Sequence, residues 1–388
     1  MGVLTQKNSQ NSSQAGGNNN QSPRDDSNQA AMAPVNFVRA SDEHLEPGNV
    51  DVSRLLLANA IDAGTFDLPA YGFLSHMYVL VEGASGAGTG AVLTEDGPYN
   101  VLQNIALTEP NGAFIAQFTS GWQMAMAQKY GGYLHPIAAD PKRSPAWSTV
   151  TAAGNFSFLL RLPVAVSGRD AVGALANQDS AGQFKFRFTY APSATLFSTP
   201  PSTTLPTVRV RVWTQAWDQP EPASAGTPNA VEPPAPGTTS FWSVQSGISV
   251  NSGENNIDIK RKGNYIRTWI FVLRTSGSRA TGDGNWPAEL RFMRDAFPAR
   301  YYNTTVWQHQ MFERTGYTGT KDTAGALDNG LRFHDYMHEF DGLLGREVRD
   351  LWQPTRGSTR LELAGSFGAA STLDIITNDV AIAQNVFV

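Results

Sequence analysis

Two ten-residue segments of this chain repeat the same residues at the same spacing. Trp122–Gly131 reads WQMAMAQKYG and Trp307–Gly316 reads WQHQMFERTG, so Trp, Gln, Met, a basic residue and Gly recur at five shared offsets. The segments lie 185 positions apart, and each is flanked by short β-type sequence. Internal repeats of this kind indicate a repeated structural unit. We therefore expect one helix-bearing β-domain that is present twice.

The spacing within each repeated segment predicts a helix. Three residues of each copy fall at i, i+4 and i+7 on one helical face, namely Trp122, Met126 and Lys129 in the first and Trp307, Met311 and Arg314 in the second. The final glycines, Gly131 and Gly316, could each provide a left-handed C-terminal cap. Trp and Met at this spacing are typical of core packing, so we interpret the stripes as structural and not as a cofactor site.

Composition indicates a β-rich protein with room for two domains. The 388 residues include 36 Gly, 23 Pro, 9 Trp and 20 Phe, and only 16% are charged. Such a mixture suits many short strands joined by turns. A net charge of −5 gives no electrostatic reason for specific nucleic-acid binding. Without cysteine there are neither disulfides nor thiolate metal sites, and with no long apolar run we expect no membrane span or secretory leader.

Alternation with period two predicts strands in both halves. The first half contains Gln183–Tyr190 (QFKFRFTY), the ladder from Phe156 to Val166, and Val208–Val212; the second contains Ile257–Lys260, Tyr265–Leu273 and Thr359–Phe367. Two further helices are expected at Ser53–Ala63 and Leu343–Trp352. The predicted fold class is therefore all-β, with a short helix in a connection of each barrel.

Composition shifts divide the chain into four parts. Residues 1–45 form a polar, flexible arm whose first 34 residues are rich in Asn, Gln, Ser and Gly. Residues 46–217 form a first barrel, and residues 240–388 a second. Between them, residues 218–239 are proline-rich and predict a linker or a long surface loop. The arm has too few basic residues to neutralise packaged RNA.

Several segments carry a family resemblance. They are Leu93–Gln103 (LTEDGPYNVLQ), Glu109–Gly112 and Ser120–Trp122 in the first half, and Asn264–Ser278 (NYIRTWIFVLRTSGS) and Phe297–Tyr302 (FPARYY) in the second. Scattered over residues 71–363, they resemble the double jelly-roll major capsid proteins of tectivirus-like phages, which are tailless and have an internal membrane. LTEDGP is the most specific of these motifs.

The resemblance implies two eight-stranded jelly rolls side by side and a homotrimer that forms a pseudo-hexagonal capsomer. Capsomers of this kind tile an icosahedral shell around an internal membrane and genome, in a virion assembled in the host cytoplasm. The implied partners are neighbouring capsomers, minor capsid, vertex or cement proteins, and the internal membrane. Because the polar arm lacks a membrane-binding amphipathic pattern, we expect it to act as a conformational switch between capsomers.

The motifs that could carry chemistry are weak. His334 and His338 in HDYMH are four residues apart, which on a helix could hold zinc. The same segment also alternates as a strand, on which the two imidazoles would lie about 13 Å apart; we expect such a strand, solvated or at an interface. Gly83–Gly90 matches no phosphate loop. Lys260–Lys262 predicts a turn, with contact to lipid headgroups or genome as the alternative. We expect no catalytic residues and no cofactor.

Other protein classes share parts of this pattern. A receptor- or glycan-binding β-sandwich spike protein would have similar strands and aromatic residues. A single-jelly-roll capsid protein with a projecting domain would usually have a basic arm, which this chain lacks. An enzyme would rest only on the histidine pair. The major capsid protein is the function that the sequence favours.

Overall fold

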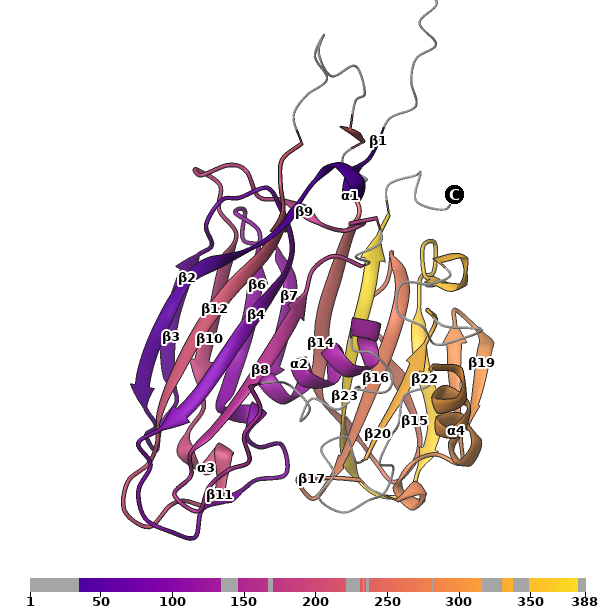
Figure 1. The fold of residues 1–388 in the computed structure, drawn as a ribbon. Helices are drawn as coiled ribbons and strands as arrows, with labels where there is room; N and C mark the ends of the chain where they lie inside the picture. Colours follow the sequence, from indigo (N-terminus) through magenta and orange to yellow (C-terminus); the bar gives the residue numbers. More distant parts are fainter. Residues whose placement is uncertain are drawn as a thin grey trace, which may run out of the picture.

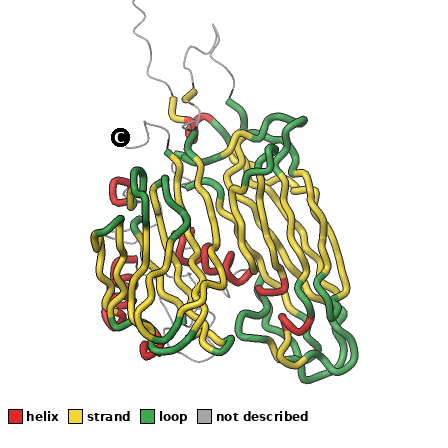
Figure 2. Tube along the Cα trace, turned by 180° about the vertical axis from the view of Figure 1, so that it is seen from behind, coloured by secondary structure: helices red, strands yellow, loops and turns green. Residues whose placement is uncertain are grey.

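Two β-lobes lie side by side in the computed structural model (Figure 1). The structure describes residues 35–133, 146–166, 170–220, 231–232, 234, 237–280, 282–315, 330–337 and 349–382. The first lobe runs from indigo to magenta and the second from orange to yellow, with strands roughly along the long axis of each lobe. The view from behind shows the same two groups of strands, with loops gathered at both ends (Figure 2). Residues 1–34 of the expected arm lie outside the described residues.

The first lobe, which we call barrel 1, is a jelly roll. Its main strands are β2 (Glu43–Leu55), β3 (Ile61–Asp67), β4 (Phe73–Ala84), β6 (Leu102–Thr108), β7 (Phe114–Ser120), β8 (Phe156–Pro163), β10 (Lys185–Tyr190) and β12 (Thr207–Trp217). They form one sheet in the order β2-β12-β4-β8 and another in the order β3-β10-β6-β7. Numbered one to eight along the chain, these orders are 1-8-3-6 and 2-7-4-5, the two four-stranded sheets of a jelly roll.

The second lobe, barrel 2, repeats that order. Its main strands are β14 (Thr239–Val250), β15 (Gly253–Asp258), β16 (Tyr265–Thr275), β18 (Glu289–Arg294), β19 (Phe297–Asn303), β20 (Leu331–Asp335), β22 (Leu361–Phe367) and β23 (Ser371–Ala381). One sheet runs β14-β23-β16-β20 and the other β15-β22-β18-β19. The chain is therefore a double jelly roll, as expected, and the alternative of one barrel with a different projecting domain is wrong.

The repeated segments occupy the same connection in both barrels. Helix α2 (Gly121–Gln128) lies between β7 and β8, and helix α4 (Thr304–Thr315) lies between β19 and β20. Each helix therefore joins the fifth and sixth strands of its own jelly roll. The sequence repeat and the strand order thus describe the same duplication from independent observations.

Alternating side chains form the core of the sheets. In β10, Phe186, Phe188 and Tyr190 are buried, while Lys185 and Arg187 are exposed. The three rings follow one another along the inner face at centroid distances of 5.7 and 5.3 Å. This period of two is what a sheet with one solvated face requires.

The helix expected at Ser53–Ala63 is wrong. Strand β2 continues through Leu55 and β3 begins at Ile61. Pairing with β12 decides the outcome, because Val50 and Val52 lie opposite Val212 and Val210 and continue the ladder to Leu55. Tertiary pairing therefore overrides the local apolar pattern. Of the helix expected at Leu343–Trp352, only Arg349–Leu351 is a described helix, a 3₁₀ turn.

Regular structure begins before the boundary expected at residue 45. Strand β1 (Val35–Asn36) pairs in parallel with β13 (Val231–Glu232) of the proline-rich segment, and helix α1 (Phe37–Ala40) follows. Phe37 is buried against Phe73 and Trp217, with ring centroids 5.2 and 6.1 Å away. One aromatic anchor therefore holds residues 35–40, which lie within the range 1–45 expected for the arm. The remaining domain boundaries stay predictions.

Candidate functional site

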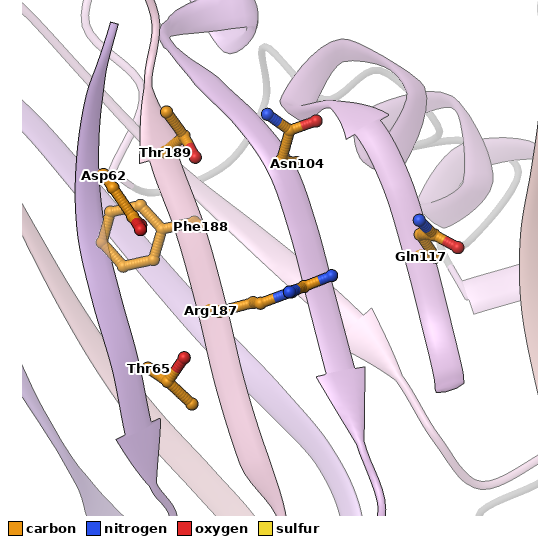
Figure 3. A pocket seen from close by; sticks show the side chains of 7 residues that line it. All are labelled: Asp62, Thr65, Asn104, Gln117, Arg187, Phe188 and Thr189. Atoms are coloured by element: carbon orange, nitrogen blue, oxygen red, sulfur yellow. The ribbon is translucent and has the colours of Figure 1, made fainter. Parts of the chain in front are cut away.

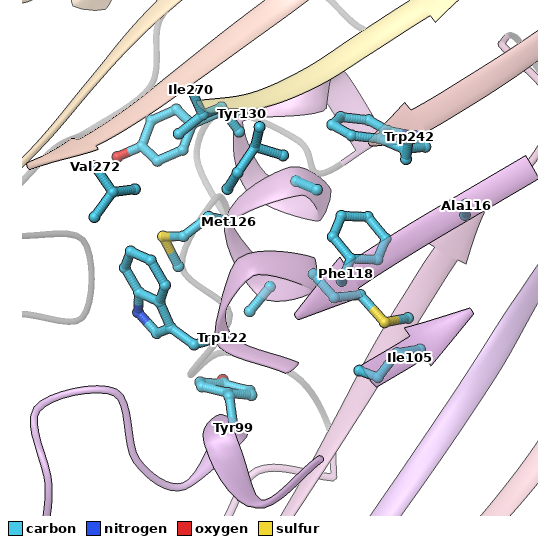
Figure 4. Close-up of a cluster of buried hydrophobic side chains, with 14 of the residues drawn as sticks. Tyr99, Ile105, Ala116, Phe118, Trp122, Met126, Tyr130, Trp242, Ile270 and Val272 are labelled. Carbon is cyan, nitrogen blue, oxygen red and sulfur yellow. The ribbon is translucent and has the colours of Figure 1, made fainter. Parts of the chain in front are cut away.

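Helix α2 is buried between the two barrels (Figure 4). Every residue from Gly121 to Ala127 is buried, and Figure 4 shows Ile270 and Val272 of β16 facing Met126 and Tyr130. Apart from Gln123 and Gln128 its residues are apolar or small, which is typical of a buried helix. The helix belongs to barrel 1 by sequence but contributes to the core that both barrels share.

Local sequence explains how α2 begins. Ser120 and Gln123 form a capping box, in which each side chain accepts a hydrogen bond from the other residue's backbone N–H. Gly121 follows, and a Cβ atom there would lie 2.3 Å from the Tyr99 carbonyl oxygen. Only glycine lets the first turn approach the backbone this closely.

The end of α2 differs from the expected cap. A π-helical segment, Lys129–Tyr133, follows the helix, and the left-handed residue is Gly132, with φ of 79°. Gly131 has another role, because a Cβ atom there would lie 2.8 Å from the Trp242 ring. The expectation that Gly131 caps the helix is wrong by one residue, since close packing on barrel 2 determines that position. Gly316 lies outside the described residues.

A buried arginine of barrel 2 binds the end of this helical segment. Arg267 of β16 is 2% exposed. Its Nη1 donates to the Gly131 carbonyl oxygen at 2.8 Å, the Tyr133 hydroxyl at 3.0 Å and the Asn378 side-chain oxygen at 3.1 Å. A cation at a helix C-terminus is favourable because the last carbonyl groups carry partial negative charge. The contact ties barrel 2 to barrel 1.

A cluster of charged residues joins the barrels on another side of α2. The Arg279 Nε lies 3.0 Å from a Glu95 carboxylate oxygen, and the Arg274 Nη2 lies 2.7 Å from an Asp96 oxygen. Both guanidinium groups also face the Trp122 ring, at 4.8 and 5.4 Å from its centre. Burial raises the pKa of Asp96 and lowers that of Arg279, although each has opposite charges beside it. These residues come from LTEDGP and from the RTSGSR segment, so the most specific motif of the resemblance contacts barrel 2.

Helix α4 has the same place in barrel 2 but a different environment. Trp307 and Met311 are buried, and the Trp307 ring stacks on Tyr302 with centroids 4.5 Å apart. Thr305, Val306, His309 and Gln310 are exposed, with Val306 at 45%. Within the described part of the chain, α4 covers its own barrel only.

The barrels meet edge to edge. Strand β7 at the edge of barrel 1 pairs in parallel with the barrel 2 edge strand β14, through Ala116 and Trp242. The equivalent edges on the far sides are β19 and β2, and in the described residues neither has a further partner strand. Both expose large apolar side chains: Phe297 (76%) and Tyr301 (59%) on β19, and Leu45 (56%) and Leu55 (47%) on β2.

The structure does not bring together the two histidines considered as zinc ligands within its described residues. His334 lies on strand β20, where it is buried between the rings of Tyr302 and Tyr336 at 5.0 and 4.3 Å. The expected strand is confirmed at Leu331–Asp335, but the expectation that it is solvated is wrong, because all five of its residues are buried and the imidazole lies among aromatic rings. His338 lies outside the described residues.

Another polar group lies at one end of barrel 1. Asp42, His44 and Asp218 each place one ligand atom within 4.8 Å of the others. His44 Nε2 lies 3.2 Å from Asp218, and the Tyr71 hydroxyl donates to the same carboxylate, which raises the pKa of Tyr71 to about 12. These contacts join the start of β2 to the end of β12 and close the barrel end. Sequence reasoning missed them because 174 positions separate His44 from Asp218.

The basic run 260–262 is partly engaged in structural contacts. The Arg261 Nε lies 2.6 Å from Asp379, and the Lys262 Nζ donates to the Thr359 carbonyl oxygen at 2.5 Å. Burial raises the pKa of Asp379, while the Arg261 contact opposes that shift. These bonds fit the expected turn. Contact of Lys260 with lipid or genome stays a prediction.

Known proteins resemble this chain in structure. Neither a protein-family model nor a curated protein matches the sequence. The atomic structure of Sulfolobus Turreted Icosahedral Virus matches with 13% identity and a TM-score of 0.58, covering 89% of this chain and 92% of that one. The major capsid protein of bacteriophage PM2 matches with 10% identity and a TM-score of 0.52, covering 89% of this chain and 99% of that one. The PBCV-1 virus capsid matches with 10% identity and a TM-score of 0.56, covering 88% of this chain and 94% of that one. At these identities the comparison concerns the fold, and the chain shares the double jelly-roll fold of these viral capsid structures.

Proposed function

We propose that this chain is a major capsid protein that assembles as a homotrimer into pseudo-hexagonal capsomers. One observation carries the proposal: the contact between the barrels has an unused counterpart on the far side of each. Inside the chain, β7 and α2 meet β14. On the far sides, among the residues that the structure describes, β19 pairs only with β18 and β2 pairs only with β12.

These free surfaces suit a ring of copies. The edge β19 of one copy can meet β2 of the next, because β19 and β2 hold the same places in their barrels as β7 and β14. Contacts of this heterologous type close a ring when the rotation fits. Three copies would place six similar barrels around one axis, and such a block tiles a surface by hexagonal packing. Exposed Phe297 and Tyr301 would then be buried against Leu45 and its neighbours.

The shell role fits what the structural neighbours are named for. They are the capsid of PBCV-1, the major capsid protein of bacteriophage PM2 and the structure of an icosahedral virus. We extend to this chain a place in the icosahedral shell of a virion that encloses an internal membrane and genome. The accompanying proposals are assembly in the host cytoplasm, contact with neighbouring capsomers and with minor capsid, vertex or cement proteins, and no enzyme activity.

Contact with the internal membrane is part of the same proposal. Among the residues that the structure describes, no helix combines the length and apolarity needed to cross a bilayer. The arm is proposed to order differently between neighbouring capsomers. An assembled particle in which the arm has one conformation at every position would contradict that role.

The test of trimer formation is the mass of the full chain in solution. Size-exclusion chromatography with light scattering is expected to give a species of about 126 kDa, three times the 41.9 kDa chain mass. The double variant Phe297→Asp/Tyr301→Asp puts two charges on the β19 edge, and it is expected to remain at the monomer mass because unpaired charges in an interface core are costly. Imaging of the wild-type species should show hexagonal outlines.

A matched control distinguishes the effect of changing the β19 edge from the general effect of adding a charge to the surface. Val92→Asp changes a side chain that is 53% exposed on β5 (Val92–Leu93), a different strand from both β19 and β2. This variant is expected to trimerise like the wild type. A wild-type chain that stays monomeric at every concentration would overturn the proposal and favour a receptor- or glycan-binding module. A trimer that survives both Asp substitutions would place the interface elsewhere.

A further inference from the structure

The outer face of the β3-β10-β6-β7 sheet contains a polar depression (Figure 3). Its volume is about 290 Å³, near the lower end of small-molecule sites. Polar side chains from all four strands line it: Asp62 and Thr65 from β3, Arg187 and Thr189 from β10, Asn104 from β6 and Gln117 from β7. Figure 3 shows Arg187 reaching from β10 across β6.

The depression is formed by the backbone of three adjacent strands. Strand β10 shifts register against β3 between Phe188 and Thr189, and against β6 between Arg187 and Thr189. On β6, Asn104 has a φ of 49°, and on β3 Gly64 has a φ of 99°. Bulges bend a sheet locally and redirect side chains. Two coincident register shifts therefore explain why this face of the sheet is hollow at this place.

The lining selects a class of ligand. It carries one positive group, Arg187, and one negative group, Asp62, so neither a phosphate nor a cationic ligand is favoured. An apolar ligand would leave the amides of Asn104 and Gln117 without partners. Carboxylate, amide and guanidinium groups are planar and bond in pairs, which suits two adjacent hydroxyl groups on a ring.

An aromatic ring lies beside the polar groups. Phe114 of β7 is 43% exposed, and the Arg187 guanidinium carbon lies 5.4 Å from its ring centre. The exposed ring offers an apolar surface next to the hydrogen-bonding groups. A sugar ring has this combination, with polar edges and apolar C–H faces.

We propose that this depression binds carbohydrate, as a pyranose with adjacent free hydroxyl groups. The proposal goes beyond the shell role and does not depend on it, because all the residues come from one barrel of one chain. A glycan at this site would attach the protein to a glycosylated surface. The low volume limits the bound portion to one or two sugar units.

The test uses saturation-transfer difference NMR on the full chain. The probes are the methyl glycosides of glucose, galactose, mannose and N-acetylglucosamine at millimolar concentration. At least one is expected to give signals with the wild type. Arg187→Lys keeps the positive charge but loses the planar guanidinium group, and Gln117→Ala removes a side-chain amide. Each variant should bind the sugar roughly tenfold more weakly, which is the effect of one lost hydrogen bond to the ligand.

The control is an exposed asparagine on the equivalent sheet of barrel 2. Asn256 lies on β15 and is exposed, so Asn256→Ala removes a surface amide without touching the depression and should leave the signals unchanged. No signal from any probe with the wild type would overturn the proposal, as would equal signals from wild type, Arg187→Lys and Gln117→Ala. Displacement of the sugar by millimolar inorganic phosphate would indicate an anion site instead. None of these results would affect the trimer mass that tests the shell role.

Discussion

Replacing Trp122 by alanine should strongly destabilise the protein, because this ring fills the junction between the barrels. The side chain is fully buried, and two guanidinium groups face its ring at 4.8 and 5.4 Å. Truncating a buried Trp costs about 3–5 kcal/mol through lost transfer free energy and the cavity left behind. The two lost cation–π contacts add about 0.5–2 kcal/mol each.

The thermal midpoint provides the measurement. For a domain of about 150–250 residues, each kcal/mol lowers the midpoint by about 2–4 °C, so the cavity term alone predicts a drop of about 6–20 °C. Differential scanning calorimetry on wild type and Trp122→Ala gives this shift directly. The control, Trp213→Ala, removes the same side chain from a half-buried position on β12 and should lower the midpoint less. If Trp122→Ala shifts the midpoint no more than Trp213→Ala, Trp122 does not hold the junction together.

Two further predictions concern buried polar groups. Burial, with the Arg161 charge beside it, lowers the pKa of His76 to about 3. Below about pH 6.5 the unfolded chain therefore binds a proton at this histidine while the folded chain does not. The free energy of unfolding is thus retained above that pH and falls at lower pH, by at most about 1.4 kcal/mol per pH unit. Urea unfolding at pH 7.5 and pH 5 should show a larger loss for wild type than for His76→Gln, and equal losses would contradict the assignment. At the contact between the barrels, Arg279→Met should destabilise the protein by about 1–3 kcal/mol, because methionine fills the volume but leaves the Glu95 and Asp96 carboxylates without the guanidinium group that contacts both. The double variant with Glu95→Gln should recover part of that loss, and strict additivity of the two single effects would show that the pair is not coupled.

The sequence predicted those parts of the fold that have a local period. The Trp and Met spacing located α2 and α4, and the alternation in KFRFTY located a strand whose inner residues are buried. The proposed double jelly roll is confirmed because both halves have the same strand order. The helix predicted from Ser53 to Ala63 is wrong, since the pairing of Val50 and Val52 with β12 is not visible in the local pattern.

The contact between the two barrels could not be predicted from the spacing of residues in the sequence. Glu95 and Arg279 are 184 positions apart, and nothing in either local segment indicates that they form an ion pair. The left-handed residue falls at Gly132 because Gly131 is needed for contact with Trp242, a residue of the other barrel. The polar depression was missed for a similar reason, since it depends on register shifts between three strands.

The different surroundings of α2 and α4 show how one repeated segment can evolve under two kinds of selection. Helix α2 meets its partner barrel on the same polypeptide during folding, so its outward residues could become apolar without making the free chain aggregate. Among the described side chains of helix α4, the polar Thr305, His309 and Gln310 are exposed together with one apolar residue, Val306. When two barrels are fused into one chain, the helix at the contact between them no longer has to be soluble on its outer side. The helix at the far edge still does.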